Sequence, residues 1–131
     1  MRTAADLDAD QRAPRAARDL VRGMALQAGC VDERVGQAAL LASELVTNAV
    51  LHGRTDRVRV ELDVDALAVR VAVHDRSPER PVPHDPDPDR LYGRGLLLVD
   101  RLAEAWGIEV HPAPPDEGGG GKAVWFRVPC R

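Results

Sequence analysis

The hydrophobic period of the chain changes from that of helices to that of strands near Arg57, and this change limits the folds that are possible. Before it, apolar residues recur every three to four positions, which is typical of helices that bury one face. After it, up to Val73, apolar and polar residues alternate, which is typical of half-buried strands. Because 131 residues are about enough for one domain, both kinds of element must share one core.

Two helices are predicted before the change of period. The first covers about residues 12–28 and ends at Gly29, since glycine is favoured directly after a helix. The second starts at residue 32 or 33 and runs to about residue 52, and its high apolar content indicates that most of its surface is covered. We expect it to be the central helix. Residues 1–11 show little pattern and are predicted to be a loose lead-in.

Four strands and a third helix are predicted after the second helix. The alternations at residues 57–64 and 67–73 indicate two antiparallel strands joined as a β-hairpin. Residues 93–107 are predicted to form a helix that ends at its last glycine and turns Trp106 inward. Residues 108–111 and 123–128 are predicted to form two further strands.

The order of these elements predicts an α+β fold, a two-layer sandwich with helices on one face of a mainly antiparallel sheet. We expect residues 1–131 to form this single domain. Residues 76–92 hold five of the ten prolines and almost no apolar side chains, so they are predicted to be a long loop. Loops of this length in a compact domain are usually functional or mobile.

Charge and composition exclude several kinds of function. The net charge of −3 argues against a general nucleic-acid binder, which needs a basic excess. No apolar run approaches the roughly 20 residues of a membrane span, and the N-terminus is too acidic for a signal peptide, so we expect a cytoplasmic protein. Cys30 and Cys130 have neither metal-ligand spacing nor the density of a disulfide scaffold, which predicts two reduced thiols and no zinc or disulfide chemistry.

Three polar residues share one face of the second predicted helix, namely Glu44, Asn48 and His52 at i, i+4 and i+8. On the helix pattern alone, this face is equally well explained as the solvent side, with Glu44 and Asn48 as a surface pair. His52 at the helix C-terminus is better explained by interaction with the last carbonyl groups than by a ligand.

Two further features flank the proline-rich loop of residues 76–92. Asp75 ends a strand, where a carboxylate either accepts hydrogen bonds from a ligand amine or starts a turn, and the turn is the more common role. Gly93 and Gly95 open a helix, so the backbone there can come close to a phosphate. The pattern is neither a dinucleotide fingerprint nor a Walker A loop, because the required third glycine and Lys-Ser/Thr pair are absent.

Taken together, the order of these motifs resembles the histidine-kinase-like ATPase domain, the Bergerat or GHKL fold. The resemblance rests on ELVTNAVLHG, then VAVHD, a long loop, GRGLLLV and a final GKAVWFRV, and it covers about residues 12–128. Within that superfamily the chain is similar to the stand-alone anti-sigma-factor serine kinases that are widespread in actinobacteria. The resemblance implies ATP and Mg²⁺ as cofactors, and a regulatory protein, either a sigma factor or an anti-sigma antagonist, as partner. It also allows a homodimer.

The resemblance assigns roles to individual residues. It implies that Asn48 holds Mg²⁺ on the phosphates and that Glu44 is the base that activates a protein hydroxyl or a water. Asp75 would accept the adenine amino group, and residues 76–92 would be the ATP lid. The expected nucleotide-binding positions are Asn48, His52, Asp75, Ser77, Gly93, Arg94, Gly95, Leu96 and Ala123.

Three departures from the family pattern bear on function. Ser77 and Glu79 replace the two glycines that often follow the aspartate, and Ala123 stands where relatives often have a threonine that joins the adenine cluster. Relatives also often begin with a strand, so the outer edge of the sheet is predicted to be missing or irregular. Two functions follow: a protein serine/threonine kinase, favoured by Glu44 and Asn48, or a non-catalytic module that acts by sequestering a partner. A small ATPase without a protein substrate is less favoured.

Overall fold

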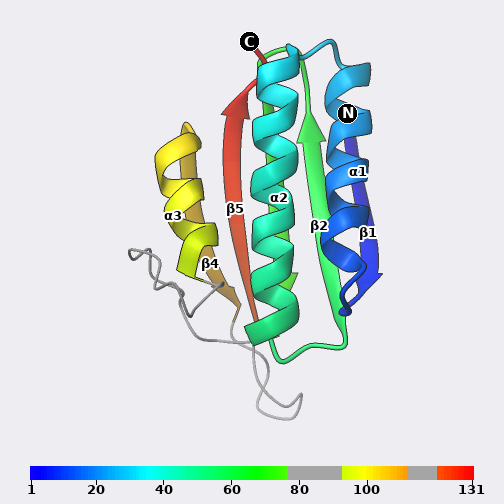
Figure 1. Cartoon of the computed structure of the whole chain (residues 1–131), viewed down its shortest axis with the longest axis vertical. Helices are drawn as coiled ribbons and strands as arrows, with labels where there is room; N and C mark the ends of the chain where they lie inside the picture. The colour runs from blue at the N-terminus through cyan, green and yellow to red at the C-terminus, as the bar shows by residue number, and fades with distance from the viewer. Residues whose placement is uncertain (77–92, 112–120) are drawn as a thin grey trace.

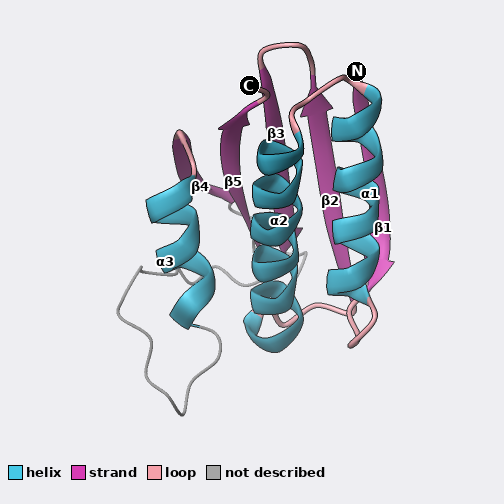
Figure 2. Cartoon of the chain, turned by 45° about the horizontal axis from the view of Figure 1, so that its top comes forward, coloured by secondary structure: helices cyan, strands magenta, loops and turns pink. Residues whose placement is uncertain are grey.

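Five strands and three helices are present in the part of the chain that the structure, a computed structural model, describes: residues 1–76, 93–111 and 121–131. All neighbouring strands are antiparallel, and the sheet has the order β1-β2-β3-β5-β4. The helices cover one face of this sheet (Figures 1 and 2), which confirms the two-layer α+β fold. The elements are β1 (Arg2–Asp8), α1 (Ala13–Gln27), α2 (Asp32–His52), β2 (Arg57–Val64), β3 (Ala68–Asp75), α3 (Gly93–Leu102), β4 (Ala105–His111) and β5 (Gly121–Pro129).

The central position of α2 is confirmed. It packs against α1 on one side and α3 on the other, and it lies across the middle of the sheet (Figure 1). Asp32 and Glu33 lie in its first turn, where negative side chains stabilise a helix by interaction with the positive end of its dipole. Gly29, with φ +83°, ends the α1 region in the left-handed conformation that glycine tolerates. Residues from α1, α2 and the inner faces of β2, β3 and β5 form the hydrophobic core between the two layers.

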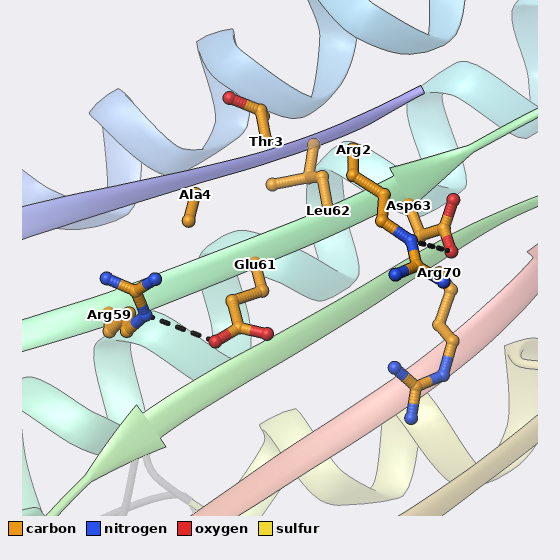
Figure 3. A pocket seen from close by; sticks show the side chains of 8 residues that line it. All are labelled: Arg2, Thr3, Ala4, Arg59, Glu61, Leu62, Asp63 and Arg70. Atoms are coloured by element: carbon orange, nitrogen blue, oxygen red, sulfur yellow. Dashed lines mark hydrogen bonds and ion pairs between the residues drawn. The ribbon is translucent and has the colours of Figure 1, made fainter.

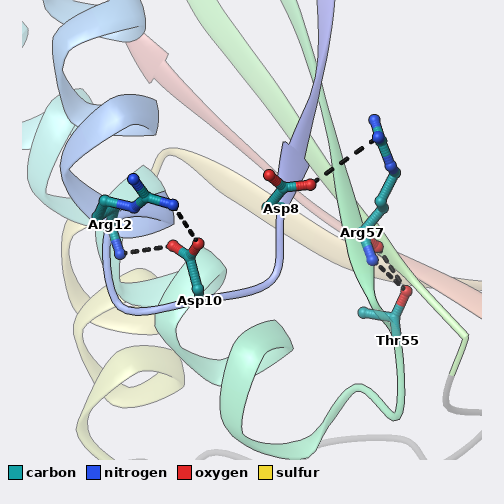
Figure 4. A network of polar contacts seen from close by, with 5 residues as sticks. All are labelled: Asp8, Asp10, Arg12, Thr55 and Arg57. Atoms are coloured by element: carbon teal, nitrogen blue, oxygen red, sulfur yellow. Dashed lines mark hydrogen bonds and ion pairs between the residues drawn. The ribbon is translucent and has the colours of Figure 1, made fainter.

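The N-terminal residues form an edge strand, so the prediction of a loose lead-in and a missing sheet edge was wrong. β1 pairs with β2 along its whole length, and three opposed pairs on the outer face carry opposite charges. The alternation was weak because the inward residues Thr3 and Ala5 are small, and only Leu7 is a larger apolar residue. At the end of β1 an ion pair joins Asp8 to Arg57 (Figure 4).

The turn from β1 into α1 is held by Asp10. Its carboxylate accepts hydrogen bonds from the backbone N–H and the guanidinium of Arg12, at 2.8 and 3.1 Å (Figure 4). These bonds lower the pKa of Asp10. On the neighbouring connection Thr55 donates to the carbonyl of Arg57, so both connections at this end are stabilised locally.

The third helix is shorter than predicted. It ends at Leu102, and Trp106 and Gly107 belong to β4 rather than to the helix. Trp106 pairs with Phe126 of β5, and its indole N–H donates to Asp100 at 2.9 Å. A residue that fits the apolar stripe of a helix also fits a strand that pairs with an apolar neighbour, and here the pairing decides.

Cys30 and Cys130 form a disulfide bond, so the prediction of two reduced thiols was wrong. The bond joins the connection between α1 and α2 to the residue after β5, across a sequence separation of 100. The two backbones are also held directly, because Val31 N–H donates to the Cys130 carbonyl at 3.0 Å. Sequence spacing could not reveal a pairing that only the strand order creates.

The face of the sheet opposite the helices is polar. A hollow on β1, β2 and β3 is lined by charged side chains that pair within it, including Arg2 with Asp63 and Arg59 with Glu61 (Figure 3). Farther along this face, burial lowers the pKa of His74, although the Glu61 carboxylate lies 3.3 Å from its Nε2. Among the helices of the described ranges, none is long and apolar enough to cross a membrane.

Candidate functional site

Glu44 and Asn48 meet the first turn of α3 at Gly95. A Cβ placed on Gly95 would lie 2.9 Å from Asn48 Nδ2 and 3.4 Å from the Cβ of Glu44, so only a residue without a side chain fits there unchanged. Both polar residues are half-buried on α2, whereas Leu41 and Leu45 of the same helix are buried in the core. Since a helix covers this side of α2, Glu44 and Asn48 are not a pair on an open surface.

The side-chain oxygen of Asn48 is an acceptor that points to a ligand. Oδ1 is buried and has no hydrogen-bond partner among the residues described. Buried acceptors in folded proteins are nearly always satisfied, so an exception indicates an ion or a water at that place. Oxygen atoms are the ligands that Mg²⁺ prefers, and the ion usually takes only one or two of them from protein. The donor set therefore fits a Mg²⁺ ion that is bound mainly through phosphates.

Asp75 is held between the end of α2 and the start of β5. A Cβ on Gly53 would lie 2.7 Å from the Cβ of Asp75, and a Cβ on Gly121 would meet its carbonyl oxygen. The N–H of Arg76 donates to the Gly53 carbonyl at 3.2 Å. Gly53 thus lets the end of α2 approach the side chain of Asp75, and Gly121 lets β5 approach its backbone. This fixed position at the carboxyl end of β3 suits a ligand-binding role better than a turn role.

Lys122 reaches Asp75 from the neighbouring strand, and sequence reasoning did not assign it to the site. The register of β3 and β5 places the two residues opposite each other. Lys122 Nζ lies 3.0 Å from Asp75 Oδ1, with only 8% and 6% of the two side chains exposed. The signal was the alternation in β5, because Lys122 shares its parity with the buried Val124 and Phe126.

Ala123 lies apart from the other candidate residues. It is opposite His74 in the register of β3 and β5, and successive side chains of a strand point to opposite faces. Ala123 therefore belongs to the helix-free face, whereas Asp75 and Lys122 face the helix layer. The position from which β5 reaches the aspartate is occupied by Lys122.

The remaining candidates are distributed around the start of α3 and the end of α2. His52 is exposed in the last turn of α2. Leu96 is buried in the core, so its side chain contributes packing. Gly93 and Arg94 are the first residues of α3, as predicted, and the side chain of Arg94 is outside the described part. Ser77 and the rest of the expected lid, residues 77–92, are also outside it.

Comparisons with known proteins agree with the fold. The model of the histidine kinase-like ATPase domain family matches residues 7–128, so the chain belongs to this family of ATP-binding domains. A comparison with curated protein sequences finds no match. Among solved structures, the chain is similar to that of the RsbU and RsbW domains of Rv1364c from Mycobacterium tuberculosis, with a TM-score of 0.70 and 23% sequence identity. The match covers 98% of this chain and 32% of that one.

Proposed function

We propose that the chain is an ATP- and Mg²⁺-dependent protein serine/threonine kinase that acts on a regulatory protein, such as a sigma factor or an anti-sigma antagonist. The family supports ATP binding, and the resemblance of the sequence motifs to those of anti-sigma-factor serine kinases supports the kind of substrate. The observation that carries the metal-dependent part is the buried Asn48 Oδ1 without a partner among the described residues. A homodimer is a further part of the proposal, to be tested by sedimentation.

The proposed site has a phosphate end and a base end. At the phosphate end, Asn48 would hold Mg²⁺, which would supply charge neutralisation at the phosphates when bound. The glycines at the start of α3 would let the backbone approach the same phosphates, where the N–H groups of the first turn and the helix dipole would favour negative charge. At the base end, Asp75 would accept the amino group of adenine.

Glu44 would be the general base. It lies one turn before Asn48 on α2, so its carboxylate and the metal-binding amide share one face of the helix. In the proposed reaction, Glu44 takes the proton of a substrate serine or threonine hydroxyl. The oxygen forms a bond to the γ-phosphorus while the bond from this phosphorus to the β-γ bridging oxygen breaks, and ADP leaves.

A phosphotransfer assay with the Glu44→Gln variant tests this function. Candidate partner proteins from the same genome are incubated with labelled ATP and Mg²⁺. We expect the variant to bind ATP as the wild type does and to transfer phosphate about 10²- to 10⁴-fold more slowly, as is typical when a positioned base is lost. Glu33→Gln is the matched control, because Glu33 is an exposed glutamate on the same helix.

The outcomes separate the two functions that the sequence left open. Equal transfer by the wild type and Glu44→Gln would show that Glu44 is not the base. If neither protein transfers phosphate while both bind a partner, the chain is a sequestering module and the kinase proposal fails.

A further inference from the structure

The pair formed by Lys122 and Asp75 differs from the base end that the family resemblance implies. There, an aspartate and a threonine hydroxyl surround the adenine. Here the residue of β5 that reaches the aspartate is a lysine, the only one in the chain. Its ammonium is a charged donor 3.0 Å from the acceptor Asp75 Oδ1, and both groups are almost fully buried.

A buried lysine costs desolvation, which a single carboxylate offsets only when the geometry is good and other polar groups share the site. A charged hydrogen bond gains strength where water is excluded. The buried ammonium is therefore a strong donor to an acceptor atom of a ligand. An ammonium carries three donor hydrogens and a carboxylate several acceptor positions, so the ion pair and a ligand can share both groups.

We propose that Lys122 is a base-recognition residue, which donates from Nζ to the adenine ring nitrogen next to the amino group while Asp75 accepts from that amino group. The edge of adenine presents a donor and an acceptor side by side, and the pair presents the complementary acceptor and donor. Enzymes that flip a base out of nucleic acid read it by hydrogen bonds to this same edge. The inference rests on the proposed function, since it adds a residue to the base end of the same site.

The position of the pair supports this assignment over a purely structural one. Gly53 lies close to the side chain of Asp75 and Gly121 lies close to its backbone carbonyl, so α2 and β5 both pack tightly against this aspartate. Lys122 also points to the helix layer, and Asn48 belongs to α2 in that layer. The cations of the opposite sheet face, such as Arg127, make their ion pairs at the surface.

Calorimetry with ATP and 1-deaza-ATP tests the inference, because the analogue has carbon in place of the ring nitrogen that Lys122 would contact. We expect the wild type to bind ATP roughly 10- to 100-fold more tightly than the analogue, the range for a hydrogen bond with one charged partner. Lys122→Met keeps the apolar stem and should bind both nucleotides alike, near the wild-type affinity for the analogue. Arg127→Met removes the same charge from the other face of β5 and should keep the wild-type preference.

A second readout needs no substitution and therefore does not depend on the folding of a variant. Because Lys122 is the only lysine, protein labelled with ¹⁵N-lysine gives a single Nζ signal. We expect this signal to shift with Mg²⁺-ATP and to stay in place with Mg²⁺-tripolyphosphate, which offers phosphates without a base.

Three results would overturn the inference. Equal affinity of the wild type for ATP and 1-deaza-ATP would show that Lys122 makes no hydrogen bond to the ring nitrogen. Tighter ATP binding by Lys122→Met would show that the lysine competes with the adenine amino group for the Asp75 carboxylate. Both results leave the proposed function standing. An absence of ATP binding by the wild type would overturn the proposed function and this inference together.

Discussion

Replacing Gly95 by alanine tests whether Asn48 and the start of α3 form one site. The new Cβ would stand 2.9 Å from Asn48 Nδ2, and ordinary contact begins at about 3.4 Å. The nearest atom is the end of a flexible side chain, so the amide can move by about 0.5 Å while the backbone stays in place. The contacts to Glu44, at 3.4 Å, are already within the ordinary range.

The substitution should therefore separate stability from binding. Alanine is favoured over glycine in a helix by up to about 1 kcal/mol, which offsets the cost of moving the amide, so the free energy of unfolding should change by less than about 1 kcal/mol. A metal-binding group displaced by a fraction of an ångström loses its geometry, and we expect Mg²⁺-dependent ATP affinity to fall roughly 10- to 100-fold.

Isothermal calorimetry with Mg²⁺-ATP, combined with urea denaturation, measures both effects. Gly36→Ala is the matched control, because Gly36 is an exposed glycine of α2 with no atom within 4 Å of an added Cβ. The control should gain up to about 1 kcal/mol of stability and keep its affinity. If Gly95→Ala binds Mg²⁺-ATP like the wild type, the Asn48 amide is not part of the nucleotide site.

Two further predictions concern stability. Replacing Cys30 and Cys130 together by serine should lower the free energy of unfolding by up to about 4.7 kcal/mol, the chain-entropy value for a loop of about 100 residues; a urea midpoint equal to that of the oxidised wild type would contradict this. Burial lowers the pKa of His74 below its usual value of 6.5. Above pH 6.5 the neutral imidazole therefore contributes to the stability of the fold, and this contribution is lost as the pH falls from 6.5 through the pKa of the folded protein. His74→Gln should therefore lose less stability below pH 6.5 than the wild type or His52→Gln, and parallel pH curves for all three proteins would exclude this origin.

The strongly periodic elements were predictable from the sequence. The apolar residues of α2 and the alternations of β2 and β3 leave only one way to bury each element, so the layers followed from them. β1 was missed because strand pairing and cross-strand charges, rather than large apolar side chains, hold it to the sheet. The boundary between α3 and β4 was missed because Trp106 satisfies both periods.

The candidate site was predictable only where residues lie close in sequence. Glu44 and Asn48 are one helical turn apart, so their common face follows from helix geometry. The meeting of Asp75 with Lys122 depends on the register between β3 and β5, which a sequence without an established strand order does not provide. An error of one residue in β5 moves the assignment from Lys122 to Ala123, on the opposite face.

The central claim, a Mg²⁺-dependent ATP site built on Asn48, is tested most directly by calorimetry of the wild type and Asn48→Ala with ATP, in the presence and absence of Mg²⁺. We expect the wild type to bind more tightly with Mg²⁺, and Asn48→Ala to lose at least about tenfold of that affinity while its thermal unfolding stays cooperative. Gln37→Ala on the same helix should behave like the wild type. Equal Mg²⁺-ATP affinities for the wild type and Asn48→Ala would contradict the role of Asn48, and with it the site.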